Sequence, residues 1–126
     1  MHSTVKNLLD IESNIKIHLD ELKINNIPKI IAVSKTFKID KILPLLDHGH
    51  IDFGENKVQE AVEKWTNVKK ENKKIKLHLI GRLQTNKVKI AVNLFIPKKF
   101  LFFLKTEDIK ILLTLCFSLI FISLIL

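Results

Sequence analysis

The sequence predicts an α/β protein in which an N-terminal helix is followed by three β/α units on a parallel sheet. Three observations predict this class: an apolar stripe of helical period opens the chain, short β-branched runs recur after it, and amphipathic segments separate those runs. Strands that alternate with helices form parallel sheets with right-handed crossovers. The 126 residues are enough for one small core.

The first helix and the first strand are marked by a change of period. Apolar residues recur at three- and four-residue steps between Thr4 and Lys23, which predicts an amphipathic helix. The Asn-Asn-Ile-Pro segment at 25–28 ends this helix. Residues 29–34 are short, apolar and β-branched, so they are expected to form a buried strand.

The second unit combines a short helix with a short strand. A helical apolar stripe covers residues 39–46, and Pro44 lies inside it, so the helix is expected to be short or to begin near the proline. Gly49 is a candidate for the left-handed residue that follows a helix. His50 to Phe53 is the second predicted strand.

The third unit begins at Asn56, which by itself is best interpreted as a helix N-cap. The helix after it carries apolar residues on one face through Val68. Residues 75–80 form the third predicted strand, which Gly81 closes. Asn86 can cap a last short helix through Val92.

Charge and cysteine content narrow the possible partners. The net charge is +8, yet Arg82 is the only arginine and the lysines are spread along the chain, which favours solvent-facing helix surfaces over a nucleic-acid site. The single cysteine, Cys116, excludes an intrachain disulfide, and the first ten residues lack the apolar region of a signal peptide. We therefore expect a cytoplasmic protein.

The β/α pattern stops near Leu94. Residues 111–126 form an apolar run, predicted to be a C-terminal helix, that falls just short of the roughly 17 residues a membrane-spanning helix needs. We divide the chain into a β/α part, 1–93, and a hydrophobic tail, 94–126. The preferred interpretation of the tail is a shifted or degenerate reading frame. The alternative is a small membrane-anchored protein that uses 111–126.

Three polar segments each follow or end a predicted strand, where ligands bind in parallel β/α proteins. They span residues 32–36, 52–61 and 78–87. Lys35 ends an apolar strand, and burial there would lower its pKa and supply the neutral amine that attacks an aldehyde. Taken singly, Lys35 is ordinarily a solvated residue, and His78 is ordinarily a structural histidine.

Taken together, these segments resemble the pyridoxal phosphate homeostasis proteins, the YggS/PROSC group. The matching strings are Ala-Val-Ser-Lys-Thr, Phe-Gly-Glu-Asn-x-Val-Gln-Glu and His-x-Ile-Gly-x-Leu-Gln-x-Asn-Lys, in the same order and spacing over about residues 5–93. The resemblance implies an alanine racemase N-terminal-like fold, a (β/α)8 TIM barrel that binds pyridoxal 5′-phosphate (PLP). This chain would supply its N-terminal part, about three β/α units plus the first helix.

The resemblance also implies the roles of individual residues. Lys35 would hold PLP as a Schiff base, Asn56 and His78 would line the cofactor ring, and residues 81–87 would lie beside the pocket. Because the family has no established catalytic activity, the chain is not expected to be an enzyme. Its role would be intracellular PLP homeostasis, as a monomer without a nucleic-acid partner or a metal site.

The sequence also departs from the family. The later barrel strands, an arginine near the pyridine nitrogen and a Gly-Ser-Thr-type phosphate cradle have no counterpart in it. A phosphate cradle built from backbone N–H groups is usually the main anchor for such a cofactor. We therefore expect a truncated or degenerate copy with weak or no PLP binding, and a sheet with open edges.

Overall fold

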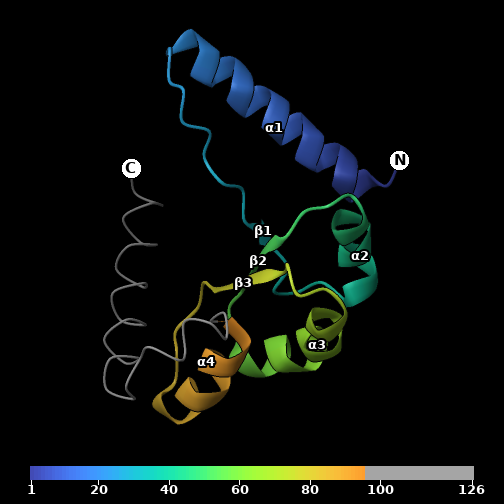
Figure 1. Cartoon of the computed structure of the whole chain (residues 1–126), viewed down its shortest axis with the longest axis vertical. Helices are drawn as coiled ribbons and strands as arrows, with labels where there is room; N and C mark the ends of the chain where they lie inside the picture. Colours follow the sequence, from blue (N-terminus) through green and yellow to red (C-terminus); the bar gives the residue numbers. More distant parts are fainter. Residues whose placement is uncertain (96–126) are drawn as a thin grey trace.

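A computed structural model describes residues 1–95 and has the predicted alternation of helices and strands (Figure 1). Three parallel strands lie at its centre, and each is followed by a helix. A single 3-10 turn, η1 (Thr85–Lys87), precedes the last helix. The elements in chain order are α1 (Ser3–Glu21), β1 (Ala32–Val33), α2 (Ile39–Asp47), β2 (Asp52–Glu55), α3 (Val58–Glu71), β3 (Lys76–Leu79) and α4 (Val88–Phe95).

The sheet has the order β1-β2-β3, so within the described residues β1 and β3 are its two edges. Ala32, Phe53 and Leu77 stand side by side in one row of the register. Because side chains alternate along a strand, this row faces one side of the sheet and the neighbouring row, Val33, Gly54 and His78, faces the other. The first strand has only two residues, whereas 29–34 was predicted.

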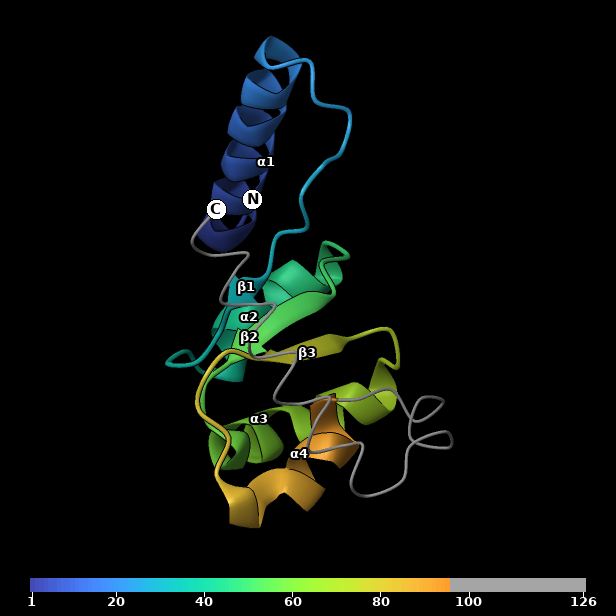
Figure 2. The same cartoon turned by 90° about the vertical axis from the view of Figure 1, so that its left-hand side faces the viewer.

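The core lies between the sheet and the helices that follow the strands. Trp65 of α3 and Phe53 of β2 are fully buried, and their ring centroids are 4.9 Å apart. Burying side chains of this size stabilises a fold by about 2 kcal/mol each. Figures 1 and 2 show α3 and α4 lying together near the sheet, while α1 extends away from it. The buried cluster consists of Ile42, Phe53, Ala61, Trp65, Ile75, Leu77 and Leu94.

Helix α1 uses only part of its predicted apolar stripe. Val5 and Leu8 are buried, and α1 packs against α2. Further along, Ile11 is 48% exposed and Leu22 is 67% exposed, so the apolar stripe is only partly covered there. The helix begins at Ser3 and ends at Glu21, close to the predicted 4–23.

Helices α1 and α2 end in the same hydrogen-bonded motif. After α2, the N–H of Gly49 donates to Leu46 O and the N–H of His50 donates to Leu45 O, both at 2.9 Å. Gly49 has a φ of +98°, so its predicted left-handed role is confirmed. After α1 the equivalent position is taken by Lys23, with a φ of 54°. A lysine there carries a steric cost that glycine avoids.

The prediction of a short helix around Pro44 is confirmed, because α2 has nine residues and continues through the proline at the loss of one helical hydrogen bond. Two other local predictions need correction. Lys57, not Asn56, precedes α3, because β2 continues through Glu55 and the chain bends at Asn56. Asn86 is part of η1 and caps nothing, and α4 runs from Val88 to Phe95 because Ala91, Val92 and Leu94 are buried.

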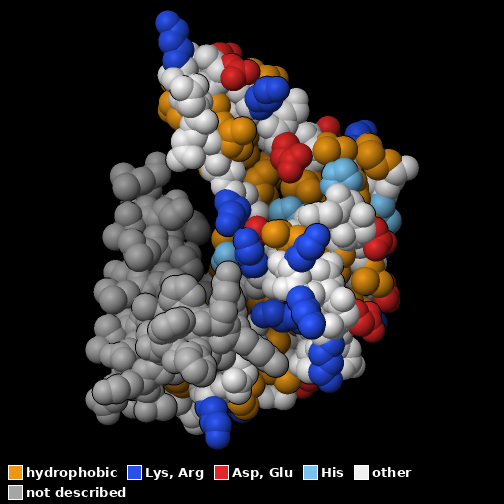
Figure 3. Space-filling model, viewed as in Figure 1, with side chains coloured by type: hydrophobic (Ala, Val, Ile, Leu, Met, Phe, Trp, Pro, Cys, Tyr) orange, Lys and Arg blue, Asp and Glu red, His pale blue; other side chains and the backbone are white. Residues whose placement is uncertain are grey.

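The lysines follow the predicted distribution. Most are exposed, and Figure 3 shows them spread over one face from α1 to the opposite end of the molecule. Within residues 1–95, every helix is too short or too polar to span a membrane. The predicted C-terminal helix, the apolar run 111–126 and most of the predicted tail lie outside the described residues.

Candidate functional site

The three predicted site residues come from adjacent strands at one end of the sheet. Lys35 follows β1 by two positions, and Asn56 directly follows β2. His78 lies in β3, in register with Gly54. Parallel strands end on the same side, so the fold gathers these residues at the carboxyl edge, where β/α proteins bind ligands. Their side chains are not hydrogen-bonded to one another within residues 1–95.

Lys35 occupies a tight turn at the end of β1. The N–H of Phe37 donates to Ser34 O at 3.1 Å, which makes Lys35 the second residue of the turn. Its side chain is exposed, whereas Ser34 is 3% exposed. The burial of Lys35 that the sequence suggested is therefore absent, because the chain turns outward directly after the buried serine.

Ser34 is bonded through all of its polar atoms. Its N–H donates to Gly54 O at 2.9 Å, which extends the pairing of β1 with β2 by one residue. Its hydroxyl donates to the Glu55 Oε1 atom at 2.7 Å and approaches Gly54 O at 3.3 Å. Its carbonyl accepts from Phe37 N and from Lys64 Nζ, the latter at 2.7 Å.

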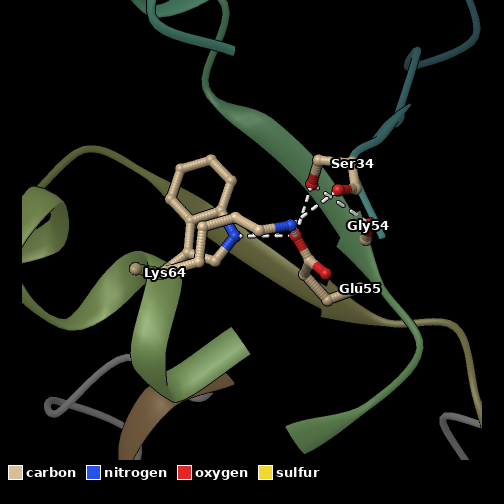
Figure 4. A network of polar contacts seen from close by, with 5 residues as sticks. Ser34, Gly54, Glu55 and Lys64 are labelled. Carbon is tan, nitrogen blue, oxygen red and sulfur yellow. Dashed lines mark hydrogen bonds and ion pairs between the residues drawn. The ribbon is translucent and has the colours of Figure 1, made fainter. Parts of the chain in front are cut away.

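A buried carboxylate stands at the centre of these contacts (Figure 4). Glu55 is fully buried on the helix side of the sheet, and its Oε1 atom accepts from Lys64 Nζ at 2.8 Å and from Trp65 Nε1 at 2.9 Å. Its Oε2 atom has no partner in the described part of the chain. A buried carboxylate is costly unless it is paired and hydrogen-bonded, and Lys64 supplies the opposite charge. None of these contacts was predicted from the sequence.

On the opposite face of the sheet, His78 is held by a second acidic residue, Asp52, which was not among the site residues predicted from the sequence. The Nε2 atom of His78 lies 2.8 Å from Asp52 Oδ1, and the Asp52 side chain is 8% exposed. A carboxylate only accepts, so the Nε2 atom of His78 donates this bond. Lys29 Nζ is 3.9 Å from the same oxygen. Strand alternation could have revealed Asp52, because it shares the face of Gly54 and His78.

Gly81 brings the end of β3 against Asn56. A Cβ atom at position 81 would lie 2.1 Å from Asn56 O, so only glycine allows this approach of the two main chains. The N–H of Ile80 donates to Glu55 O at 2.8 Å just before it. Asn56 therefore lies between its own strand and the segment 81–87, which the resemblance placed beside the pocket.

A cavity of about 420 Å³ lies elsewhere, near the start of β2. Its lining includes Lys16 of α1, Pro28 and Asp52, and excludes all three predicted site residues. Within residues 1–95, no cluster of three or more His, Cys, Asp or Glu side chains could hold a metal ion. The carboxyl edge of the sheet, which holds the three predicted site residues, therefore remains the candidate functional site.

The fold and the site define a class, a parallel β/α protein with a lysine after its first strand and polar residues after its second and third. No protein-family model matches the chain. It is 47% identical over 78 residues to the pyridoxal phosphate homeostasis protein of Buchnera aphidicola, covering 59% of this chain and 34% of that protein. The protein of the same name from Pasteurella multocida is 37% identical over 91 residues, covering 71% and 39%.

A solved structure gives the same result. PipY from Synechococcus elongatus, with PLP bound, matches with a TM-score of 0.51 and 36% sequence identity, over 64% of this chain and 39% of that one. Over the matched residues, this chain is similar to the pyridoxal phosphate homeostasis proteins and to PipY. It spans between a third and two fifths of the length of these relatives. Their names describe the handling of a cofactor.

Proposed function

We propose that this chain binds pyridoxal 5′-phosphate through the amine of Lys35 and acts in PLP homeostasis. The observation that carries the proposal is the position of Lys35, in a fixed turn after β1 and beside the ends of β2 and β3. The match to PipY, whose structure has PLP bound, also supports the proposal. In this proposal the three units are the N-terminal part of a (β/α)8 barrel, with the cofactor-binding residues inside 1–93.

The polar side chains at the carboxyl edge fit the aldehyde and the ring of PLP. PLP, when bound, supplies an aldehyde that condenses reversibly with a neutral primary amine. Lys35 provides that amine, while the Asn56 amide and the His78 imidazole provide polar contacts for the ring. The sequence offers no glycine-rich loop for the phosphate, because its three glycines, Gly49, Gly54 and Gly81, are far apart.

The residues of the chain would act mainly by binding and orientation. The exposed side chain of Lys35 is accessible to an incoming aldehyde. Asp52 holds the His78 ring through its Nε2 atom and so orients the imidazole. Gly81 fixes the main chain at Asn56. None of these residues is proposed to transform a substrate.

The absence of a phosphate loop sets the expected strength of binding. Backbone N–H groups around a phosphate usually supply much of the affinity for such cofactors. We therefore propose weak binding, by a truncated or degenerate copy of the family. The monomeric state, the cytoplasmic location and the lack of a nucleic-acid partner are further parts of this proposal.

Trapping with borohydride tests the assignment of Lys35. The full chain is incubated with PLP, reduced, digested and mapped by mass spectrometry. Reduction fixes the cofactor on whichever amine holds it, so we expect the adduct mainly on Lys35. Lys38 is the matched control, because it is an exposed lysine one turn away. The assignment is wrong if Lys35→Ala takes up as much PLP as Lys38→Ala does.

A further inference from the structure

The turn that carries Lys35 is connected to helix α3 by the network shown in Figure 4. Lys64 of α3 donates from one ammonium group to both Ser34 O, at 2.7 Å, and Glu55 Oε1, at 2.8 Å. Ser34 reaches the same Glu55 oxygen through its hydroxyl, at 2.7 Å. The first residue of the turn is thus attached to β2 and to α3 at once.

These contacts differ from ordinary surface pairs in their burial. The side chains of Lys64 and Glu55 are 12% and 0% exposed. Bonds to ionised groups are shorter and stronger than neutral ones, and they strengthen away from water. By contrast, Lys57 and Glu60 form a pair of similar length, 2.7 Å, but their side chains are 67% and 43% exposed. The exposed pair contributes little to order.

The bond to Ser34 O has the more direct consequence for Lys35, and the hydroxyl bond from Ser34 to Glu55 holds the same residue in place. That oxygen also accepts from Phe37 N and so closes the turn. A carbonyl held by two donors cannot rotate freely, and the peptide joining Ser34 to Lys35 is fixed with it. The direction in which the Lys35 side chain leaves the backbone depends on that peptide and on the φ angle of Lys35, which the closed turn restricts.

We infer that Lys64 and Glu55 are positioning residues for Lys35, which hold its turn in the orientation that presents the amine at the carboxyl edge of the sheet. The inference rests on the proposed function for its biological meaning. The two residues do not touch the cofactor in this account. They act through the Ser34 carbonyl and hydroxyl.

The double variant Glu55→Gln with Lys64→Met tests the inference. It removes both charges and the bond to Ser34 O, yet the glutamine oxygen can still accept from Ser34 and Trp65. The matched control is Lys57→Met with Glu60→Gln, the same chemical change in an exposed pair. The first measurement is hydrogen exchange of the Phe37 amide, which we expect to be about tenfold faster in the test variant and unchanged in the control.

The second measurement is the ratio of borohydride-trapped PLP on Lys35 to that on Lys38. We expect this ratio to fall severalfold in the test variant only. Faster exchange at Phe37 in the test variant supports the inference even if the wild-type chain forms no Lys35 adduct. The missing adduct would refute the proposed function and leave the inference about the turn standing. A folded test variant with wild-type exchange and a wild-type ratio overturns the inference.

A milder change covers the case in which the double variant does not fold. Ser34→Ala removes the hydroxyl link to Glu55 and leaves the pair of Lys64 with Glu55 intact. It should accelerate exchange at Phe37 by about threefold, an effect that Lys64→Arg should lack because arginine keeps a charged donor. Exchange at the wild-type rate in folded Ser34→Ala would count against the inference.

Discussion

Replacing Gly81 by alanine should destabilise the protein through a clash that no side-chain movement can relieve. The added Cβ would lie 2.1 Å from Asn56 O and 2.7 Å from both Asn56 C and Asn56 Cα. Ordinary contact begins near 3.4 Å, so the two main chains must separate by about 1.3 Å. The hydrogen bond from Ile80 N to Glu55 O lies directly beside this contact and would be lost or lengthened.

The magnitude follows from two costs. Overfilling a packed site costs about 1–3 kcal/mol, and losing one buried hydrogen bond costs about 1 kcal/mol. We expect Gly81→Ala to lower the free energy of unfolding by about 2–4 kcal/mol. Gly54→Ala is the matched control, because its Cβ would meet only side-chain carbons of Ile31 and Ile80, at 3.3 Å. Small shifts of these side chains should hold its cost below about 1 kcal/mol.

Urea unfolding followed by tryptophan fluorescence measures both variants. Trp65 is the only tryptophan and is fully buried, so its emission reports the loss of the core. Equal m-values are required before the midpoints are compared. If Gly81→Ala proves as stable as Gly54→Ala, the close approach of position 81 to Asn56 is not a feature of the folded protein, and the reasoning fails.

Three further predictions concern other parts of the fold. Asp52→Asn should lower the free energy of unfolding by about 1 kcal/mol, because it weakens a charge-assisted hydrogen bond to His78. Urea denaturation of Asp52→Asn, His78→Gln and the double variant should give a double-variant loss that differs from the sum of the two single losses. If the two losses simply add, the contact between these side chains is absent. Lys23→Gly should raise the free energy of unfolding by roughly 0.5–1 kcal/mol, since it removes a lysine with a φ of 54°. The control Lys16→Gly, in the middle of α1, should lower it. If both variants lose stability, Lys23 does not have the left-handed backbone conformation. Burial lowers the pKa of Lys69 below its ordinary 10.5, so the unfolded state binds more protons between the two pKa values and stability rises with pH there. This gain in the free energy of unfolding is complete above pH 10.5 and is lost as pH falls through the folded-state pKa of Lys69. Urea titrations at several pH values should show the gain in the wild type and not in Lys69→Met. An identical pH dependence of the two proteins would contradict the prediction.

Much of the fold was determined by local pattern in the sequence. The alternation of helix and strand follows from a change in apolar period between 3.6 and 2, which local geometry alone imposes. Gly49 was predictable for a similar reason, because a glycine after an apolar helical stripe is the usual left-handed terminator. Lys35, Asn56 and His78 could be singled out because strand ends in parallel sheets are where ligands bind. Their roles came from motif resemblance and stay predictions.

The contacts that fix the site were decided by tertiary structure. Lys64 is nine residues from Glu55 and 30 from Ser34, and no periodicity indicates that its ammonium would bond both. Asp52 and His78 meet because the parallel register sets position 54 beside position 78. Gly81 is required only because the end of β3 passes directly against Asn56. Such contacts depend on strand order, on register and on which face each side chain occupies, and these are settled only when the whole core packs.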